Sequence, residues 1–335
     1  MKNYKIINII GYSLLLISLW LTFISAYLIK FQTTYLIGLF LFLALFFLNQ
    51  LSPRTFLIII TISFLLFIIS PSPTVIVSFF PLFGFLFAKE PKFKCPQYFQ
   101  KYLTTSVYLF IILYLIFVSE NSNASHNYLS ILILYGIIAE YLLFETCSKF
   151  YIPLIIFCFL IIGNRSSIFL LMIFMRSKFT LLIFFSIAIS FIAMTIGKIE
   201  IFKNFQILFE DGGLLNRSYG ETRGDYIDEF SSKFNFLNLS YNNWNFKYVP
   251  QTSNGFYDLH NSFLTIIVRD SYLGLFKLFL WTLQIFFLPI GFFTGISMRS
   301  YYDTFLLGGV NDILLYALIG KNIRKFLLNI NKYKR

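Results

Sequence analysis

Long apolar runs separated by short basic gaps constrain this chain more than any other feature. A helix needs about 20 predominantly apolar residues to cross the hydrocarbon core of a bilayer. With 58% hydrophobic and only 13% charged residues among 335, the chain is too apolar for one globular core. The runs therefore predict an all-α, polytopic integral membrane protein. They lie at 6–29, 35–51, 56–70, 73–88, 103–118 and 128–144, then as a short pair at 150–163 and 166–176, then at 179–196, with three more between 261 and 320.

The basic residues predict how the runs are oriented, because Lys and Arg collect in the cytoplasmic gaps of membrane proteins. If the N-terminus, with Lys2 and Lys5, is placed in the cytoplasm, more than half of the 27 Lys and Arg residues fall on that side. About twelve spans with both termini in the cytoplasm fit this pattern. Ten or eleven also fit, because 150–176 is short for two crossings and 261–298 has no clear break.

The same pattern divides the chain into five segments, of which one is a long non-cytoplasmic loop. This loop contains Trp244, several glycines and many Asn, Tyr and Phe residues, so we expect it to be folded. Within it, 221–236 has apolar residues at helical spacing and predicts a short amphipathic helix. The segments are N-terminal transmembrane helices at 1–149, a short helical hairpin and the following span at 150–196, the loop at 197–260, C-terminal transmembrane helices at 261–320 and a basic cytoplasmic tail at 321–335.

The net charge of +12 does not indicate nucleic-acid binding. The basic residues lie in gaps between apolar runs, whereas nucleic-acid binding requires a folded basic face. The chain has two histidines, His126 and His260, which excludes a multi-histidine metal site, and its three cysteines lack metal-ligand spacing. We therefore expect no nucleic-acid partner, no metal and no cofactor.

Arginines at the non-cytoplasmic face are the first candidate site residues. Arg165 lies in Gly-Asn-Arg-Ser-Ser, between two apolar runs, and an arginine at membrane depth is a functional-site hypothesis by default. Its fork suits bidentate phosphate binding, and the alternative is a turn whose arginine reaches the lipid head groups. In the loop, Arg217 and Arg223 lie six residues apart among glycines and can clamp a diphosphate. Alternatively, either arginine pairs with Glu221 or Asp225.

The end of the loop supplies the next candidates. His260 and Asn261 open the following apolar stretch, and a histidine at a membrane boundary can act as a general base near neutral pH. The alternatives for this block are a helix cap or an interfacial side chain. Arg269 and Asp270 follow within the apolar stretch, where a charged pair indicates a buried ion pair or a water-filled cavity.

Taken in order, these features resemble the O-antigen polymerase and O-antigen ligase family of membrane glycosyltransferases. The shared features are many hydrophobic spans, a Gly-x-Arg-Ser turn (Gly163 to Ser166) between two short helices, and a later outer loop with arginines. The loop closes with His-Asn-x-x-Leu, then an acidic residue and Gly-Leu, at His260, Asn261, Leu264, Asp270, Gly274 and Leu275. The resemblance covers residues 150–320, and the N-terminal half matches only as generic spans.

The resemblance implies a substrate, a location and a set of roles. Donor and acceptor are polyprenyl-diphosphate-linked oligosaccharides at the periplasmic face of a bacterial inner membrane, and a sugar hydroxyl of the acceptor attacks the anomeric carbon of the donor. Arg165, with Arg217 or Arg223, neutralises the leaving diphosphate without a metal, and His260 is the general base. Membrane lipids and a chain-length regulator protein are the further partners. The resemblance implies His260, Arg165 and Arg223 as catalytic residues, and Arg217, Asn261, Arg269 and Asp270 as substrate-binding residues.

Three other functions compete with a polymerase. A ligase runs nearly the same reaction with lipid A-core as acceptor. A flippase or transporter of lipid-linked sugar predicts related halves and charged residues along a central path, and we see no such repeat in the sequence. A structural assembly subunit does not require converging arginines and a histidine. Convergence of Arg165, Arg217, Arg223 and His260 around one outward-facing cavity is the arrangement that a transferase predicts.

Overall fold

A computed structural model of the chain shows a helical protein that divides into two compact units. Unit 1 comprises Met1–Cys158 with Gly308–Arg335, and unit 2 comprises Phe159–Leu307. Within the described ranges, helices predominate and no β-strand occurs, which confirms the all-α fold. The structure describes residues 2–27, 34–49, 57–58, 61, 79, 81–85, 95–117, 127–160, 165–175, 221–234, 239, 244–249, 257, 259, 261–302 and 312–333.

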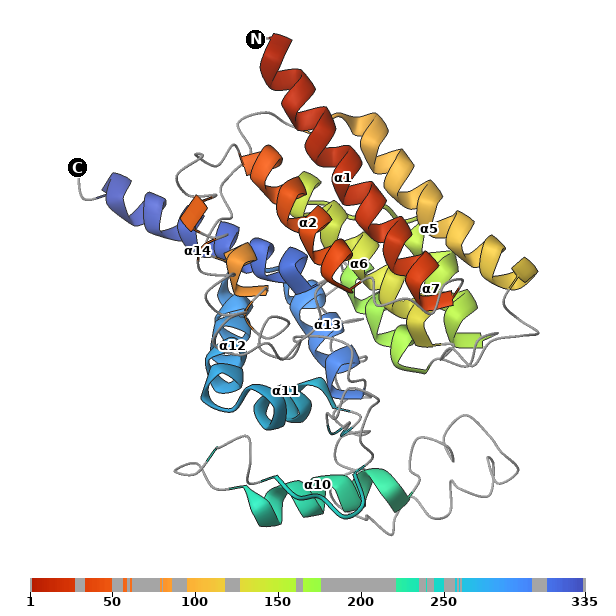
Figure 1. Cartoon of the computed structure of the whole chain (residues 1–335), viewed down its shortest axis with the longest axis vertical. Coiled ribbons are helices and arrows are strands. Elements are labelled where there is room, and N and C mark those ends of the chain that lie inside the picture. The colour runs from red at the N-terminus through yellow and green to blue at the C-terminus, as the bar shows by residue number, and fades with distance from the viewer. Residues whose placement is uncertain are drawn as a thin grey trace. The chain divides into compact units, whose positions relative to one another are not determined.

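Unit 1 is a bundle of long apolar helices (Figure 1). Helix α1 packs along α2 and also contacts α5 and α6, while α14 contacts α2 and α6. Aromatic side chains join α1 to α5: Phe23 stacks on Phe110 with ring centroids 5.0 Å apart, and Trp20 meets the same ring edge-on at 4.8 Å. The helices are α1 (Lys2–Tyr27), α2 (Thr34–Asn49), α5 (Gln97–Phe117), α6 (Asn127–Phe144) and α14 (Ile313–Tyr333); α7 (Tyr151–Leu160) begins in unit 1 and ends in unit 2.

Two of these helices are long and apolar enough to cross a membrane, over Ile6–Ile24 in α1 and Gln97–Ile116 in α5. They support an association with a membrane, in agreement with the sequence. Shorter apolar helices occupy Leu36–Leu48, Leu129–Phe144 and Tyr272–Phe286. The predicted spans at 56–70, 73–88 and 179–196 lie wholly or mostly outside the described residues. The number of spans and their orientation therefore stay predictions.

Unit 2 contains shorter helices and most of the candidate site. The 3-10 helix η1 packs along α13 around Phe169, Met172 and Met298, and α11 contacts both α12 and α13. Helix α10 confirms the amphipathic helix predicted at 221–236. The elements are η1 (Arg165–Phe174), α10 (Glu221–Lys233), α11 (Ser262–Asp270), α12 (Tyr272–Thr282), η7 (Leu283–Phe286) and α13 (Ile290–Tyr302).

The two stretches for which the sequence left the number of spans open are each divided into shorter helices in the structure. The short pair predicted at 150–163 and 166–176 corresponds to α7 and η1, and the described parts, 10 residues each, are shorter than a spanning helix requires. The stretch 261–298 contains α11, α12, the 3-10 helix η7 and the start of α13, because the chain breaks at Ser271 and again before α13. Pro289 directly precedes the first turn of α13, where the missing N–H of a proline costs no helical hydrogen bond.

Candidate functional site

Asn261 begins the candidate site because its side chain starts helix α11. Its Oδ1 accepts hydrogen bonds from the backbone N–H groups of Phe263 at 2.9 Å and Leu264 at 3.1 Å, and its own backbone is extended. This is an N-cap, which satisfies two of the backbone donors that a helix leaves open at its start. The helix cap foreseen as an alternative for this block is therefore present at Asn261, and binding of substrate by Asn261 stays a prediction.

A buried ion cluster lies at the other end of α11. Asp270 accepts two hydrogen bonds from the Arg269 guanidinium, from Nε to Oδ1 at 2.7 Å and from Nη2 to Oδ2 at 2.8 Å. Lys277, one helix further on, also donates from Nζ to Oδ2 of Asp270 at 2.5 Å. The Asp270 and Lys277 side chains are fully buried, and that of Arg269 is 11% exposed. The charged pair predicted from the sequence is thus an ion pair, and Lys277 is an addition that the sequence analysis missed.

Among the described residues, the cluster places two cations, Arg269 and Lys277, around one carboxylate, Asp270. A buried charge is costly unless it is paired and hydrogen-bonded. The Asp270 carboxylate forms an ion pair with Arg269 and with Lys277 and accepts hydrogen bonds from both. The bidentate Arg269–Asp270 contact also holds the guanidinium in one orientation. An oriented guanidinium of this kind suits the oxygens of anions such as phosphate.

The backbone between α11 and α12 brings Lys277 to Asp270. Ser271 has φ 54° and ψ −126°, a conformation that L-residues with a side chain rarely adopt, and its N–H donates to the Ile267 carbonyl at 2.8 Å. A Cβ at Gly274 would lie 2.3 Å from the Ile266 carbonyl oxygen, so only glycine permits this close approach of α12 to α11. The strained turn and the glycine together fold the two helices against each other. Such strain is characteristic of functional sites.

The structure describes the backbone of two of the candidate arginines. Arg165 is the first residue of η1, and Arg223 lies in the first turn of α10. Both belong to unit 2, as do Asn261, Arg269 and Asp270. Arg217 and His260 lie outside the described residues, and His260 directly precedes the Asn261 cap along the chain. The structure thus describes the α11–α12 part of the predicted site, and the convergence of the arginines with His260 stays a prediction.

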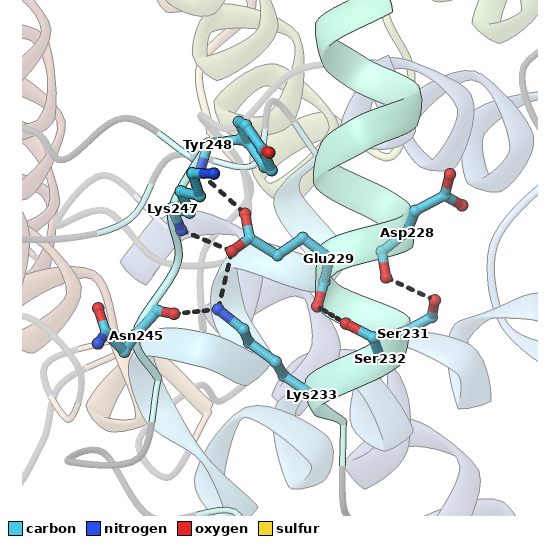
Figure 2. Close-up of polar contacts among 8 residues, drawn as sticks. All are labelled: Asp228, Glu229, Ser231, Ser232, Lys233, Asn245, Lys247 and Tyr248. Atoms are coloured by element: carbon cyan, nitrogen blue, oxygen red, sulfur yellow. Dashed lines mark hydrogen bonds and ion pairs between the residues drawn. The ribbon is translucent and has the colours of Figure 1, made fainter.

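The long loop is folded where the structure describes it, around the carboxylate of Glu229 on α10 (Figure 2). Glu229 Oε1 accepts hydrogen bonds from the backbone N–H of Lys247 at 2.5 Å and from Lys233 Nζ at 2.8 Å, and Oε2 accepts one from the backbone N–H of Tyr248 at 3.0 Å. Lys233 Nζ also donates to the Asn245 carbonyl. One carboxylate therefore ties α10 to residues 244–249.

Stacked aromatic rings also join α10 to residues 244–249. The Trp244 ring stacks on Phe230 and on Phe246, each with centroids 5.4 Å apart and planes within 10°. Lys233 Nζ lies 5.2 Å from the centroid of the Phe246 ring, so the same ammonium group serves both the ion pair and a cation–π contact. The polar and aromatic contacts confirm that this part of the loop is folded.

Replacing Glu229 with glutamine is expected to loosen residues 244–249. Burial alone raises the pKa of Glu229, but the hydrogen bonds from Lys233 and from two backbone N–H groups lower it to about 2. Because the folded-state pKa is depressed, the stabilisation is present above the ordinary carboxyl pKa of about 4.3 and is lost as the pH falls toward 2. Hydrogen exchange at neutral pH should therefore show faster exchange at Lys247 and Tyr248 in Glu229→Gln than in the wild type.

Asp228→Asn is the matched control for Glu229→Gln. Asp228 is the exposed neighbouring carboxylate, and its described contact is through its backbone carbonyl, which accepts from the Ser231 hydroxyl. The substitution removes the same charge from the same helix and should leave exchange at residues 244–249 unchanged. Equal exchange in Glu229→Gln and the wild type would show that the carboxylate does not hold the loop.

Buried acidic residues in unit 1 have structural contacts. Glu140 Oε1 accepts from the Ser148 backbone N–H at 2.8 Å and from the Gln100 side chain. Asp312 Oδ1 accepts from the Tyr135 hydroxyl at 3.1 Å. Through these contacts Glu140 and Asp312 join helices within the bundle. Within the ranges that the structure describes, no three His, Cys, Asp or Glu residues gather as metal ligands.

Comparisons with protein-family models, with curated proteins and with solved structures found no match. The function is therefore argued from the residues of the site.

Proposed function

We propose that the chain is a membrane glycosyltransferase that polymerises polyprenyl-diphosphate-linked oligosaccharide repeat units of a surface polysaccharide. It acts at the periplasmic face of the bacterial inner membrane, with about twelve spans and both termini in the cytoplasm. One observation carries the proposal: helix α11 begins at the Asn261 cap, directly after His260 in the chain, and ends in a cluster where Arg269 and Lys277 surround Asp270. A histidine and oriented cations are the two kinds of group that transfer from a diphosphate donor requires.

The reaction requires a base and a stabilised leaving group. The hydroxyl oxygen of the acceptor sugar forms a bond to the anomeric carbon of the donor, and the bond from that carbon to the diphosphate oxygen breaks. His260 accepts the hydroxyl proton, since imidazole is half-protonated close to neutral pH. The polyprenyl diphosphate leaves as an anion and carries the bonding electron pair with it.

The arginines supply the positive charge that the leaving diphosphate needs. Arg165, with Arg217 or Arg223, contacts the diphosphate, as forked donors suit phosphate oxygens. Arg269 has an orientation set by two hydrogen bonds to Asp270, so it is a donor that requires little reorganisation during the reaction. Fixed donors of this kind stabilise a developing charge without a metal.

Deleting the protein and examining cell-surface glycans on a ladder gel tests the proposal. In a strain without the protein, we expect lipid A-core that carries a single repeat unit and no longer chains, with the ladder restored by the wild-type chain. The physical reason is that ligation to lipid A-core is a separate reaction and continues with unpolymerised units.

The other patterns on the gel correspond to the competing functions. Bare lipid A-core with accumulated lipid-linked polymer in the deletion strain would show a ligase. Accumulation of single lipid-linked units at the cytoplasmic face would show a flippase. An unchanged ladder would reject all three and leave the membrane association and the helical fold.

A further inference from the structure

The two halves of α14, the last helix of unit 1, differ in how far their side chains are buried. In α14, residues 313–320 are all buried, and a Cβ on Gly320 would lie 2.3 Å from the carbonyl oxygen of Phe85, so this half packs closely in the bundle. The helix continues to Tyr333 (Figure 1). The side chains of residues 322–330 are half-buried or exposed. The sequence predicted a basic tail after 320, and the structure shows that this tail is helical to Tyr333.

The exposed half of α14 is both basic and apolar. Ile323, Phe326, Leu327 and Ile330 have the spacing of one helical face, and the Phe326 and Leu327 side chains are 49% and 52% exposed. No acidic residue occurs between 313 and 335. The basic residues over the same stretch are Lys321, Arg324, Lys325, Lys332, Lys334 and Arg335. So many charges prevent the segment from crossing a bilayer, and the exposed apolar face prevents it from being an ordinary solvated helix.

Ion pairs fix where this half of α14 begins relative to α6. Glu145, just after α6, pairs through Oε1 with Lys321 Nζ at 3.1 Å and with Lys325 Nζ at 3.3 Å. Lys321 Nζ also donates to the Leu142 carbonyl at 3.2 Å. The basic half of α14 therefore starts at the end of the bundle where α6 finishes.

The same end of unit 1 carries the residues of a membrane interface. Because Gln100 at the start of α5 and Ser148 after α6 both donate to Glu140, the start of α5 lies at this end too. Among the exposed side chains around it are aromatic and basic ones, a combination typical of the boundary between head groups and water on the cytoplasmic side. They are Tyr98, Lys101, Tyr102, Lys149 and Phe150.

We propose that residues 321–333 of α14 form an interfacial helix that binds anionic lipid head groups. The apolar face, defined by Ile323, Phe326, Leu327 and Ile330, inserts at the boundary between head groups and acyl chains, and the basic side chains that do not pair with Glu145 contact lipid phosphates. The occupant is the anionic bilayer surface, because residues 321–333 include four basic residues and no acidic one, which matches a negative surface potential. This inference is independent of the proposed glycosyltransferase activity.

Fluorescence of a label on the full-length chain tests the inference. Leu327→Cys carries an environment-sensitive fluorophore on the apolar face, and Asn329→Cys carries it on the opposite, exposed face of the same turn. Each protein is reconstituted in vesicles of phosphatidylcholine with or without phosphatidylglycerol, and quenching by doxyl-labelled lipid is measured. Wild type taken through the same labelling corrects for the half-buried Cys147.

We expect strong quenching at position 327 and weak quenching at 329, with the contrast larger in vesicles that contain phosphatidylglycerol. In the double variant Arg324→Gln, Lys332→Gln, the partition constant of the helix between water and the anionic bilayer surface should fall about fivefold for each charge removed. Quenching of the label at position 327 reports this change. Equal quenching at both positions, as for a helix in water or in contact with protein, would overturn the proposal. So would quenching at 327 that is the same in neutral and anionic vesicles.

Discussion

Replacing His260 with glutamine is expected to remove the long glycan chains and leave lipid A-core with single repeat units. Glutamine keeps a polar side chain of similar size, but it cannot accept a proton from the sugar hydroxyl near neutral pH. Loss of a general base lowers a rate by about 10²–10⁴-fold. The measurement is the glycan ladder of a deletion strain complemented with His260→Gln, with immunoblots of the membrane fraction to establish that the variant is present.

The chain offers a matched control, because it has one other histidine. His126 lies in a predicted short loop on the same non-cytoplasmic side, so His126→Gln makes the same chemical change on the same face of the membrane. We expect His126→Gln to give a wild-type ladder. Long chains produced by His260→Gln at wild-type protein levels would contradict the role of His260 as the base.

Much of the helical framework could be predicted from the sequence, because it depends on strong periodic signals. Apolar runs near the length of a bilayer core predicted the all-α fold, and apolar residues at helical spacing predicted α10. The ion pair of Arg269 with Asp270 was one of the two alternatives predicted for charges in an apolar stretch, the other being a water-filled cavity. Each of these predictions used residue type and spacing alone.

The remaining contacts could not be predicted, for physical reasons that differ from site to site. The break at Ser271 depends on a positive φ, which a single serine in an apolar stretch signals only weakly, so the sequence showed no clear break there. Lys277 reaches Asp270 only because of that break. Glu229 is tied down mainly by backbone N–H groups of Lys247 and Tyr248, which every residue type except proline provides.

Removing the Asp270 carboxylate is expected to destabilise the fold strongly. Asp270→Ala leaves the buried Lys277 ammonium without the oxygen that it contacts at 2.5 Å, and it removes both hydrogen bonds from Arg269. Loss of one partner from a buried ion pair costs about 3–5 kcal/mol. Thermal unfolding of the purified protein in detergent should show a clear fall in the melting temperature.

Substitutions at Lys277 separate stability from function. Lys277→Met keeps the length and the apolar stem while leaving Arg269 and Asp270 as a neutral pair, so we expect a melting temperature close to the wild type. The double variant Asp270→Ala with Lys277→Met should be more stable than Asp270→Ala alone, because the buried ammonium is gone. If the positive charge of Lys277 helps to hold the diphosphate, Lys277→Met will be folded and yet make mostly single repeat units. A full ladder from Lys277→Met would assign the cluster a structural role, and an Asp270→Ala protein as stable as the wild type would contradict even that role.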